Sequence, residues 1–299
     1  MFWIALSLIG AFLQAFGSAV SKKVLKVHEA KNVIGFVSYF FAGIIFFSVH
    51  FFSTGTFWMG GLGVKFWIVT AAFSVINVLG AWFLYRALEF AELNYVMPYM
   101  TLTSLSLVLP PMFLLGEVPS LGSFFGMAVI VAGAILMNHS KRNLTADASE
   151  KRASNRKGLK FFLVTAICFT ILPTLAKVAI QESSVVFASF LSHAGTSFGF
   201  LSLLFIQREE RELRELFLKN SRRYLLFVLL IGLIAVGENG SINAALSMTP
   251  VAQVFAIKRL MPLFAFLIGF FYFRERGELP KKIMATALMV AGAIMTIIL

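Results

Sequence analysis

Residues 250–273 read PVAQVFAIKRLMPLFAFLIGFFYF, and this stretch decides the class of the protein. Apart from Gln253 and the adjacent cations Lys258 and Arg259, nearly every side chain in it is apolar. A helix of roughly 20 mainly apolar residues can cross a bilayer, so the stretch predicts a membrane span. An ionisable side chain near the bilayer centre costs at least about 2.5–3.5 kcal/mol. Two neighbouring cations therefore indicate a watery cavity or an anion, and we expect a positively charged binding site there.

The composition indicates that the whole chain resides in a membrane. The 299 residues are 59% hydrophobic and only 13% charged, well below the charged fraction of soluble domains. The net charge of +12 does not indicate a nucleic-acid partner, because the basic residues are confined to short connections between apolar runs. The single cysteine, Cys168, excludes an intrachain disulfide framework and a cysteine-based metal cluster. We predict no metal and no cofactor.

Ten apolar segments are long enough to span a bilayer, which predicts an all-α polytopic membrane protein with ten transmembrane helices. Glycine, alanine and serine recur in these segments, as close helix packing in lipid requires. The expected spans are 2–20, 33–52, 65–86, 94–115, 119–138, 159–177, 184–206, 224–247, 250–273 and 280–299. Prolines inside spans predict kinks or broken helices at Pro98, Pro110, Pro111, Pro173 and Pro262.

The distribution of lysine and arginine predicts the orientation. Of the 26 basic residues, 22 lie in or beside alternate connections on one side, whereas Lys65 and Lys177 are the two assigned to the other side. This bias places the first side in the cytoplasm and both chain termini outside, in the inner (cell) membrane. The cytoplasmic connections are then 21–32, 139–158, 207–223 and 274–282.

Two of these connections have further features. Residues 139–158 are polar and charged, so we interpret them as a cytoplasmic linker between a first five-helix repeat, 1–138, and a second, 159–299. In the connection 207–223, Leu213, Leu216 and Phe217 fall on one face of a helical pattern. A short helix on the cytoplasmic membrane surface and a solvated helical connector both fit this pattern.

The two halves of the chain resemble each other. At an offset of 158 residues, eight of the 31 positions from Ala87 to Glu117 are identical to those from Ala245 to Glu275. The pentapeptide V-A-G-A-I then occurs at 131–135 and again at 290–294. Five spans per half is an odd number, so the two repeats must be inverted relative to each other. Inverted repeats are typical of transporters that hold their substrate near the membrane midplane.

These features resemble the drug/metabolite transporter superfamily of the EamA type. The resemblance covers essentially the whole chain and is carried by Leu115-Gly116-Glu117 and Phe273-Arg274-Glu275, each followed by V-A-G-A-I. It implies a ten-helix bundle that works by alternating access. Members are usually described with cytoplasmic termini, whereas the loop charges predict the reverse for this chain. Lys258 and Arg259 also resemble the Lys-Arg pair that sugar-phosphate translocators carry in their ninth span, where it implies an anionic ligand.

Six residues are candidates for substrate binding. Lys258 and Arg259 either contact the substrate or pair with other helices, and one can face the cavity while the other does not, since adjacent helical residues point about 100° apart. Glu238 and its neighbour Asn239 lie within the eighth span. Glu238 is interpreted as a structural ion-pair partner, a substrate contact or a proton site.

The other two candidates lie in the seventh and fourth spans. His193 shares a polar helical face with Ser189, Ser192 and Thr196, and forms either a helix–helix hydrogen bond or a proton relay. Tyr99 belongs to a group of hydroxyls in the fourth span that suit a sugar or polyol, and that also serve as packing contacts.

The function predicted from these residues is secondary-active transport of a small organic anion, phosphorylated or carboxylated. Coupling to a proton or to an exchanged solute both fit it, and no oligomeric state follows from it. One alternative is an exporter of neutral or cationic amphiphiles or amino acids, and another is a lipid flippase or membrane assembly protein. An enzyme is not predicted, because the sequence contains no Walker A, H-E-x-x-H or G-x-S-x-G motif.

Overall fold

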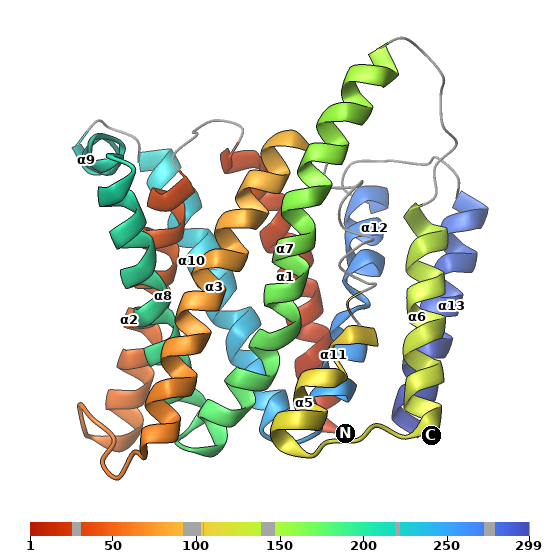
Figure 1. Ribbon diagram of the computed structural model, residues 1–299, viewed down its shortest axis with the longest axis horizontal. Coiled ribbons are helices and arrows are strands. Elements are labelled where there is room, and N and C mark those ends of the chain that lie inside the picture. Colours follow the sequence, from red (N-terminus) through yellow and green to blue (C-terminus); the bar gives the residue numbers. More distant parts are fainter. Residues whose placement is uncertain are drawn as a thin grey trace. The chain divides into compact units, whose positions relative to one another are not determined.

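The computed structural model describes residues 1–25, 31–91, 103, 105–138, 147–218, 222–271 and 279–298. Within these ranges every regular element is an α-helix (Figure 1). The helices are α1 (Phe2–Leu25), α2 (Lys31–Thr54), α3 (Val64–Phe90), α5 (Leu109–Leu115), α6 (Leu121–Asn138), α7 (Asp147–Gln181), α8 (Val185–Ile206), α9 (Glu210–Leu218), α10 (Arg222–Leu246), α11 (Val251–Lys258), α12 (Met261–Phe271) and α13 (Leu279–Ile298).

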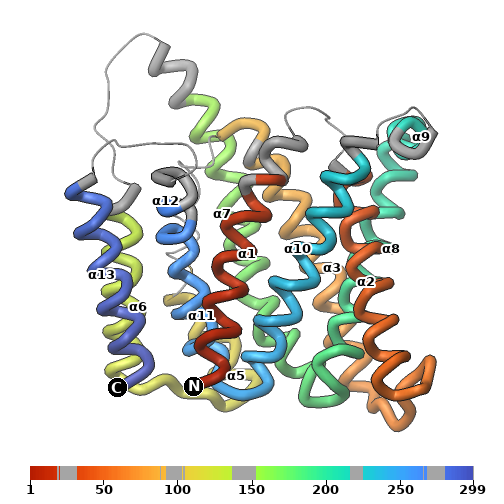
Figure 2. Tube along the Cα trace, turned by 180° about the vertical axis from the view of Figure 1, so that it is seen from behind, coloured from red at the N-terminus to blue at the C-terminus, as the bar shows by residue number. Residues whose placement is uncertain are grey.

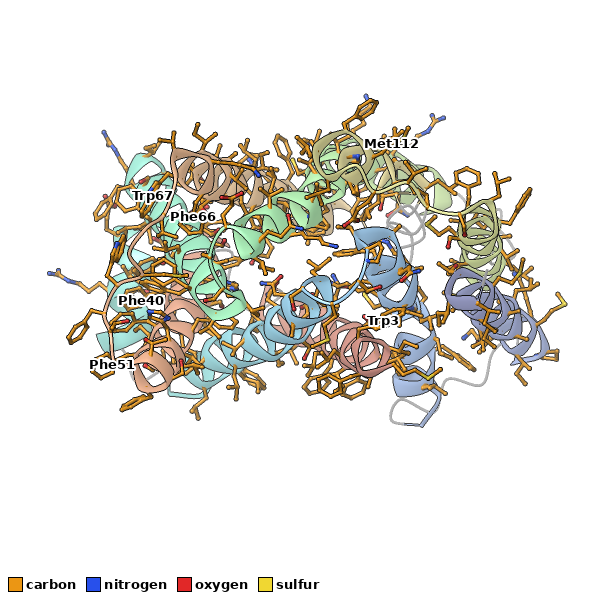
Figure 3. All side chains as sticks on the ribbon, turned by 90° about the horizontal axis from the view of Figure 1, so that it is seen from below. Trp3, Phe40, Phe51, Phe66, Trp67 and Met112 are labelled. Atoms are coloured by element: carbon orange, nitrogen blue, oxygen red, sulfur yellow. The ribbon has the colours of Figure 1, made fainter. Side chains whose placement is uncertain are left out.

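The helices confirm an all-α polytopic membrane protein. Among the described residues, six helices are long and apolar enough to cross a membrane, in α2, α3, α7, α8, α10 and α13, and the shorter apolar stretches Phe2–Ser18 and Leu121–Leu136 add to them. Large apolar side chains also lie on the outside of the bundle. Phe40 and Trp67, labelled in Figure 3, are 52% and 41% exposed. Such side chains suit an outer surface that faces lipid and its interface.

The chain divides into two compact units, and each unit combines parts of both sequence halves. Unit 1 comprises Met1–Trp82 and Leu172–Met248, and unit 2 comprises Phe83–Ile171 and Thr249–Leu299. The predicted repeat boundaries, 1–138 and 159–299, therefore differ from the boundaries of the compact units. Each unit is stabilised by packing between helices that are far apart in the sequence.

Unit 1 pairs helices from the two halves in opposite directions. Gly35 of α2 faces Phe200 of α8, and Gly43 faces Ala194 further along, so the two helices run antiparallel. Figure 1 shows α2 and α8 side by side, and Figure 2 shows the same for α1 and α10, which also contact each other. Helices α2 and α8 are the second spans of their halves. Equivalent spans of an inverted repeat run in opposite directions, as these two helices do.

Unit 2 shows the same inversion at the repeated pentapeptide. Gly133 of α6 faces Ala285 of α13, and Gly292 of α13 faces Gly126 of α6. The two contacts are related by an offset of 159 residues, which is also the offset between the two V-A-G-A-I sequences. The pentapeptides thus lie at equivalent places in one antiparallel helix pair, where glycine lets the backbones approach closely.

The predicted linker is helical over part of its length. Helix α7 begins at Asp147, so residues 147–158 of the predicted linker are helical. Residues 139–146 lie outside the described residues. Alanine, glutamate, lysine and arginine are frequent in this stretch and favour helix without any apolar face. The Ser154 hydroxyl donates to the carbonyl oxygen of Phe90 at 2.6 Å, and Lys157 Nζ lies 3.9 Å from the centroid of the Phe90 ring. These contacts attach the polar start of α7 to the end of α3.

The helix predicted within 207–223 is confirmed as α9. Its Leu213 packs against a buried cluster made by α2, α8 and α10, which comprises Val33, Ile34, Val37, Leu204 and Val228. An exposed i,i+4 ion pair, Arg211 to Glu215 at 3.2 Å, lies on α9. Because Leu213 packs against the cluster made by α2, α8 and α10, we favour the interpretation of α9 as a helical connector.

Candidate functional site

The predicted ninth span is broken at the cation pair. Helix α11 ends at Lys258, helix α12 begins at Met261, and Arg259 and Leu260 form the turn between them. The Leu260 N–H donates to a carbonyl three residues back instead of four, at 3.0 Å. Pro262 has no N–H to donate to the carbonyl of Lys258, its helical partner four residues earlier. The expectation of a kink or break at Pro262 is confirmed.

Both cations are buried beside the same ring. Lys258 is 8% exposed and Arg259 is 6% exposed. Lys258 Nζ lies 5.2 Å, and Arg259 Cζ 6.0 Å, from the centroid of the Phe255 ring, distances at which a cation interacts with an aromatic face. The two cations therefore gather on one side of α11 and its turn. Phe255 was missed in the sequence, although its i,i+3 and i,i+4 spacing to the pair predicts this contact.

The Arg259 guanidinium is only partly satisfied. Its Nη2 donates to the Thr103 hydroxyl at 2.7 Å, whereas its Nε is buried and has no hydrogen-bond partner among the described residues. Within the described part of the chain, no carboxylate forms an ion pair with Arg259. A guanidinium presents a planar fork of donors that matches a carboxylate or a phosphate. As far as the described residues show, the site therefore offers a buried positive charge together with a donor that has no partner.

A carboxylate holds the other end of α11. Gly116, with φ of 69°, ends α5 in the left-handed conformation that glycine adopts without strain. The next residue, Glu117, accepts a hydrogen bond from the Val251 N–H at 2.8 Å through Oε2. The residue before α11 is Pro250, which provides no side-chain cap. Glu117 thus supplies both the missing acceptor and a negative charge at a helix N-terminus.

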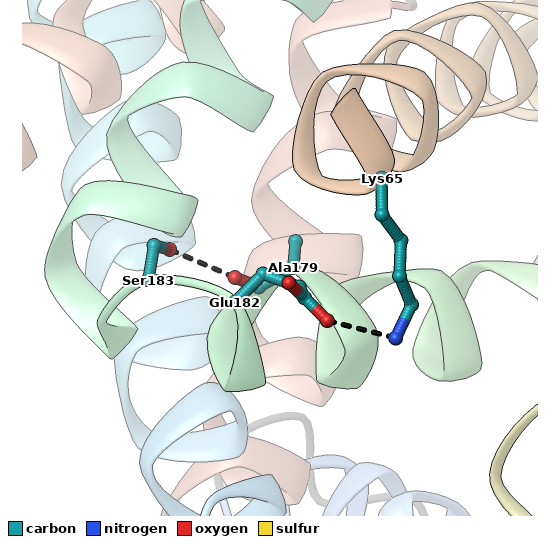
Figure 4. A network of polar contacts seen from close by, with 4 residues as sticks. All are labelled: Lys65, Ala179, Glu182 and Ser183. Atoms are coloured by element: carbon teal, nitrogen blue, oxygen red, sulfur yellow. Dashed lines mark hydrogen bonds and ion pairs between the residues drawn. The ribbon is translucent and has the colours of Figure 1, made fainter. Parts of the chain in front are cut away.

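Replacing Glu117 with alanine is expected to lower the free energy of unfolding by about 1–2 kcal/mol, the usual effect of losing such a cap. Glu182→Ala is the matched control, because Glu182 pairs with Lys65 at 2.7 Å in a largely exposed ion pair (Figure 4). Exposed pairs contribute about 0–1 kcal/mol. Thermal unfolding of the purified protein in detergent compares the two variants. Equal shifts would contradict a capping role of Glu117.

In unit 1 the candidates Glu238 and Asn239 lie on α10. Glu238 is partly exposed. Asn239 Nδ2 donates to the carbonyl oxygen of Ala235 on its own helix, at 2.9 Å. The amide of Asn239 is therefore engaged within α10.

The polar face predicted on the seventh span is confirmed as a buried face of α8. His193 is 4% exposed, and the face also comprises Ser189, Ser192 and Thr196, all buried. The centroid of its ring lies 5.6 Å from that of Tyr39 and 5.0 Å from that of Phe46. His193 thus lies between aromatic rings of α2.

The candidates fall into two groups. Unit 2 holds Lys258 and Arg259 together with Thr103, Phe255 and Glu117. Unit 1 holds Glu238, Asn239 and His193. Tyr99 lies outside the described residues.

Comparisons with known proteins agree with the helical architecture. The sequence model of a family described as the EamA-like transporter family matches residues 1–139 and 156–298. A solved structure titled "Crystal structure of protein" is similar to this chain with a TM-score of 0.70 and 13% sequence identity, over 98% of this chain and 97% of that one. Among curated proteins, none matches the chain.

Proposed function

The chain belongs to the EamA-like transporter family, within the drug/metabolite transporter superfamily, and on this premise we propose that it carries a small anionic solute across the membrane by alternating access. The protein is a multi-pass membrane protein, and its family transports small solutes. The proposal adds the charge of the solute, which is phosphorylated or carboxylated. Two inverted repeats that exchange their conformations give such a carrier its two access states.

The buried Arg259 is the observation that supports an anion most directly. Its guanidinium is 6% exposed and keeps one N–H without a partner among the described residues. A buried charge is costly unless an opposite charge accompanies it. A phosphate or carboxylate supplies both the charge and the acceptor, with Lys258 as a second cation beside the same ring. Glu238, in unit 1, then balances charge or couples transport to a proton.

Thermal shifts of the detergent-purified protein test the charge of the solute. The panel comprises inorganic phosphate, sugar phosphates, dicarboxylates, amino acids and organic cations. A ligand at 100 times its Kd stabilises the folded state by about 2.7 kcal/mol, so a bound anion is expected to raise Tm clearly. Stabilisation by organic cations or neutral amphiphiles alone, unchanged in Arg259→Gln, would contradict the proposal and favour an exporter of those compounds.

We also propose that both termini face the outside and that the basic connections face the cytoplasm. An epitope tag placed before Met1 is expected to bind antibody in spheroplasts with intact membranes. A tag inserted in 139–146 is expected to bind only after permeabilisation. The opposite pattern would show that the loop charges do not decide the orientation of this chain.

A further inference from the structure

The hydrogen bonding of His193 determines where its ring hydrogen lies. Nδ1 is 2.7 Å from the main-chain carbonyl oxygen of Ser189. A carbonyl oxygen only accepts, so Nδ1 carries the hydrogen. Within the described residues His193 forms no ion pair, and a charged ring would be a buried cation, so the neutral ring is favoured. In that tautomer Nε2 holds a lone pair and is an acceptor.

Two pairs of polar side chains near His193 are hydrogen-bonded to each other. Asn243 Nδ2 donates to the Ser189 hydroxyl at 2.8 Å, and Asn77 Nδ2 donates to the Thr196 hydroxyl at 3.2 Å. Nε2 of His193 is buried and has no hydrogen-bond partner in the described part of the chain. A buried acceptor without a donor carries a desolvation cost. A donor that enters from outside the protein would remove this cost.

Aromatic rings surround the imidazole that carries Nε2. The ring centroids of Tyr39 and Phe46 lie 5.6 Å and 5.0 Å from that of His193. An aromatic wall with one buried polar group is the usual way in which pockets select the orientation of a ligand. We infer that Nε2 of His193 accepts a hydrogen bond from a hydroxyl or N–H group of a small solute that enters unit 1, an inference that rests on the proposed transport function.

A first test does not depend on the identity of the solute. Cys168 is the single cysteine, so Cys168→Ser provides a cysteine-free background. In that background His193→Cys is expected to react with methanethiosulfonate ethylammonium, because a position that a solute contacts must be reached by a small molecule. Leu204→Cys, on the same helix and 0% exposed, is the control and is expected to stay unreactive. Absence of labelling in His193→Cys would overturn the inference.

A second test measures the preference for a donor. Each probe pair is uncharged and differs by one hydroxyl group: glycerol against 1,3-propanediol, and erythritol against 1,2,4-butanetriol. We expect the wild-type protein to bind the member with the additional hydroxyl about threefold to tenfold more tightly, as one net hydrogen bond predicts. His193→Gln retains an acceptor and is expected to keep the preference, whereas His193→Leu is expected to lose it. His50→Leu removes another buried histidine, on α2, and is expected to leave the preference unchanged.

The outcomes separate this inference from the proposed function. A preference that persists in His193→Leu overturns the inference and leaves Nε2 with a bound water or a packing role. If no anion of the thermal-shift panel stabilises the protein, the proposed function fails. In that case the labelling experiment still tests the inference, which is overturned if His193→Cys does not react.

Discussion

Arg259→Gln is expected to lower anion transport by about 100-fold, the largest effect of any single substitution considered for this protein. Removing one partner of a buried charge pair typically costs 2–5 kcal/mol or more, and about 1.4 kcal/mol corresponds to each factor of ten. The reason is that the anion would lose a charge-assisted hydrogen bond in a place where water does not replace it. Uptake of the anion found by thermal shift, into proteoliposomes with equal amounts of each variant, measures the loss.

Two further variants show which property of Arg259 matters. Arg259→Lys keeps the charge but loses the planar fork, so an intermediate loss of transport is expected. Thr103→Val removes the acceptor of the Nη2 bond at 2.7 Å without changing the charge, and a loss of about tenfold or less is expected. Arg259→Gln is expected to unfold at the same temperature as the wild type, or higher, because it removes a buried cation. Normal transport combined with a large loss of stability would instead identify Arg259 as a structural ion.

Gly292→Val is expected to have the largest effect on stability. A Cβ atom at Gly292 would lie 2.6 Å from the carbonyl oxygen of Gly126 and 2.8 Å from the backbone nitrogen of Ile130. These are backbone atoms of α6, so α6 and α13 would have to move apart and lose packing along their length. Overpacking costs about 1–3 kcal/mol, and backbone displacement places this variant at the upper end, with a fall in Tm of roughly 5–10 °C.

Ala291→Val is the matched control within the same pentapeptide. Ala291 is exposed on α13, so the added methyl groups are expected to leave Tm almost unchanged. Both variants are compared by thermal unfolding in the same detergent. If Gly292→Val unfolds at the temperature of Ala291→Val, the close approach of α6 and α13 does not contribute to stability.

The sequence by itself determined the class of the protein and most of its elements. Apolar runs of about 20 residues are a local signal, because a bilayer core of fixed thickness selects them independently of tertiary contacts. The internal repeat of the two halves was visible in the sequence for the same reason. Equivalent spans of the two halves meet similar surroundings and keep similar residues. The break at Pro262 was predictable because a missing N–H is a property of one residue. The buried face of Ser189, Ser192 and His193 followed from 3.6-residue periodicity.

Local signals did not specify the partners of polar residues. The polar start of α7 was interpreted as a linker because helix formation without an apolar face leaves no periodic signal. Asn239 stays a candidate substrate contact, and the sequence did not reveal that its Nδ2 also donates to the carbonyl oxygen of Ala235 on its own helix. Both cases depend on backbone groups, whose partners a pattern of apolar residues does not specify.

Only the tertiary structure decided which residues surround the cations. The contact between Glu117 and Val251 joins residues 134 positions apart, and that between Arg259 and Thr103 joins residues 156 apart. Neither has a sequence signal, because side-chain hydrogen bonds form wherever folding brings a donor to an acceptor. The tautomer of His193 was decided in the same way, by the carbonyl of Ser189 beside Nδ1. Span length and helical period are properties of the local chain and the bilayer, whereas the chemistry of a buried polar group depends on its neighbours in space.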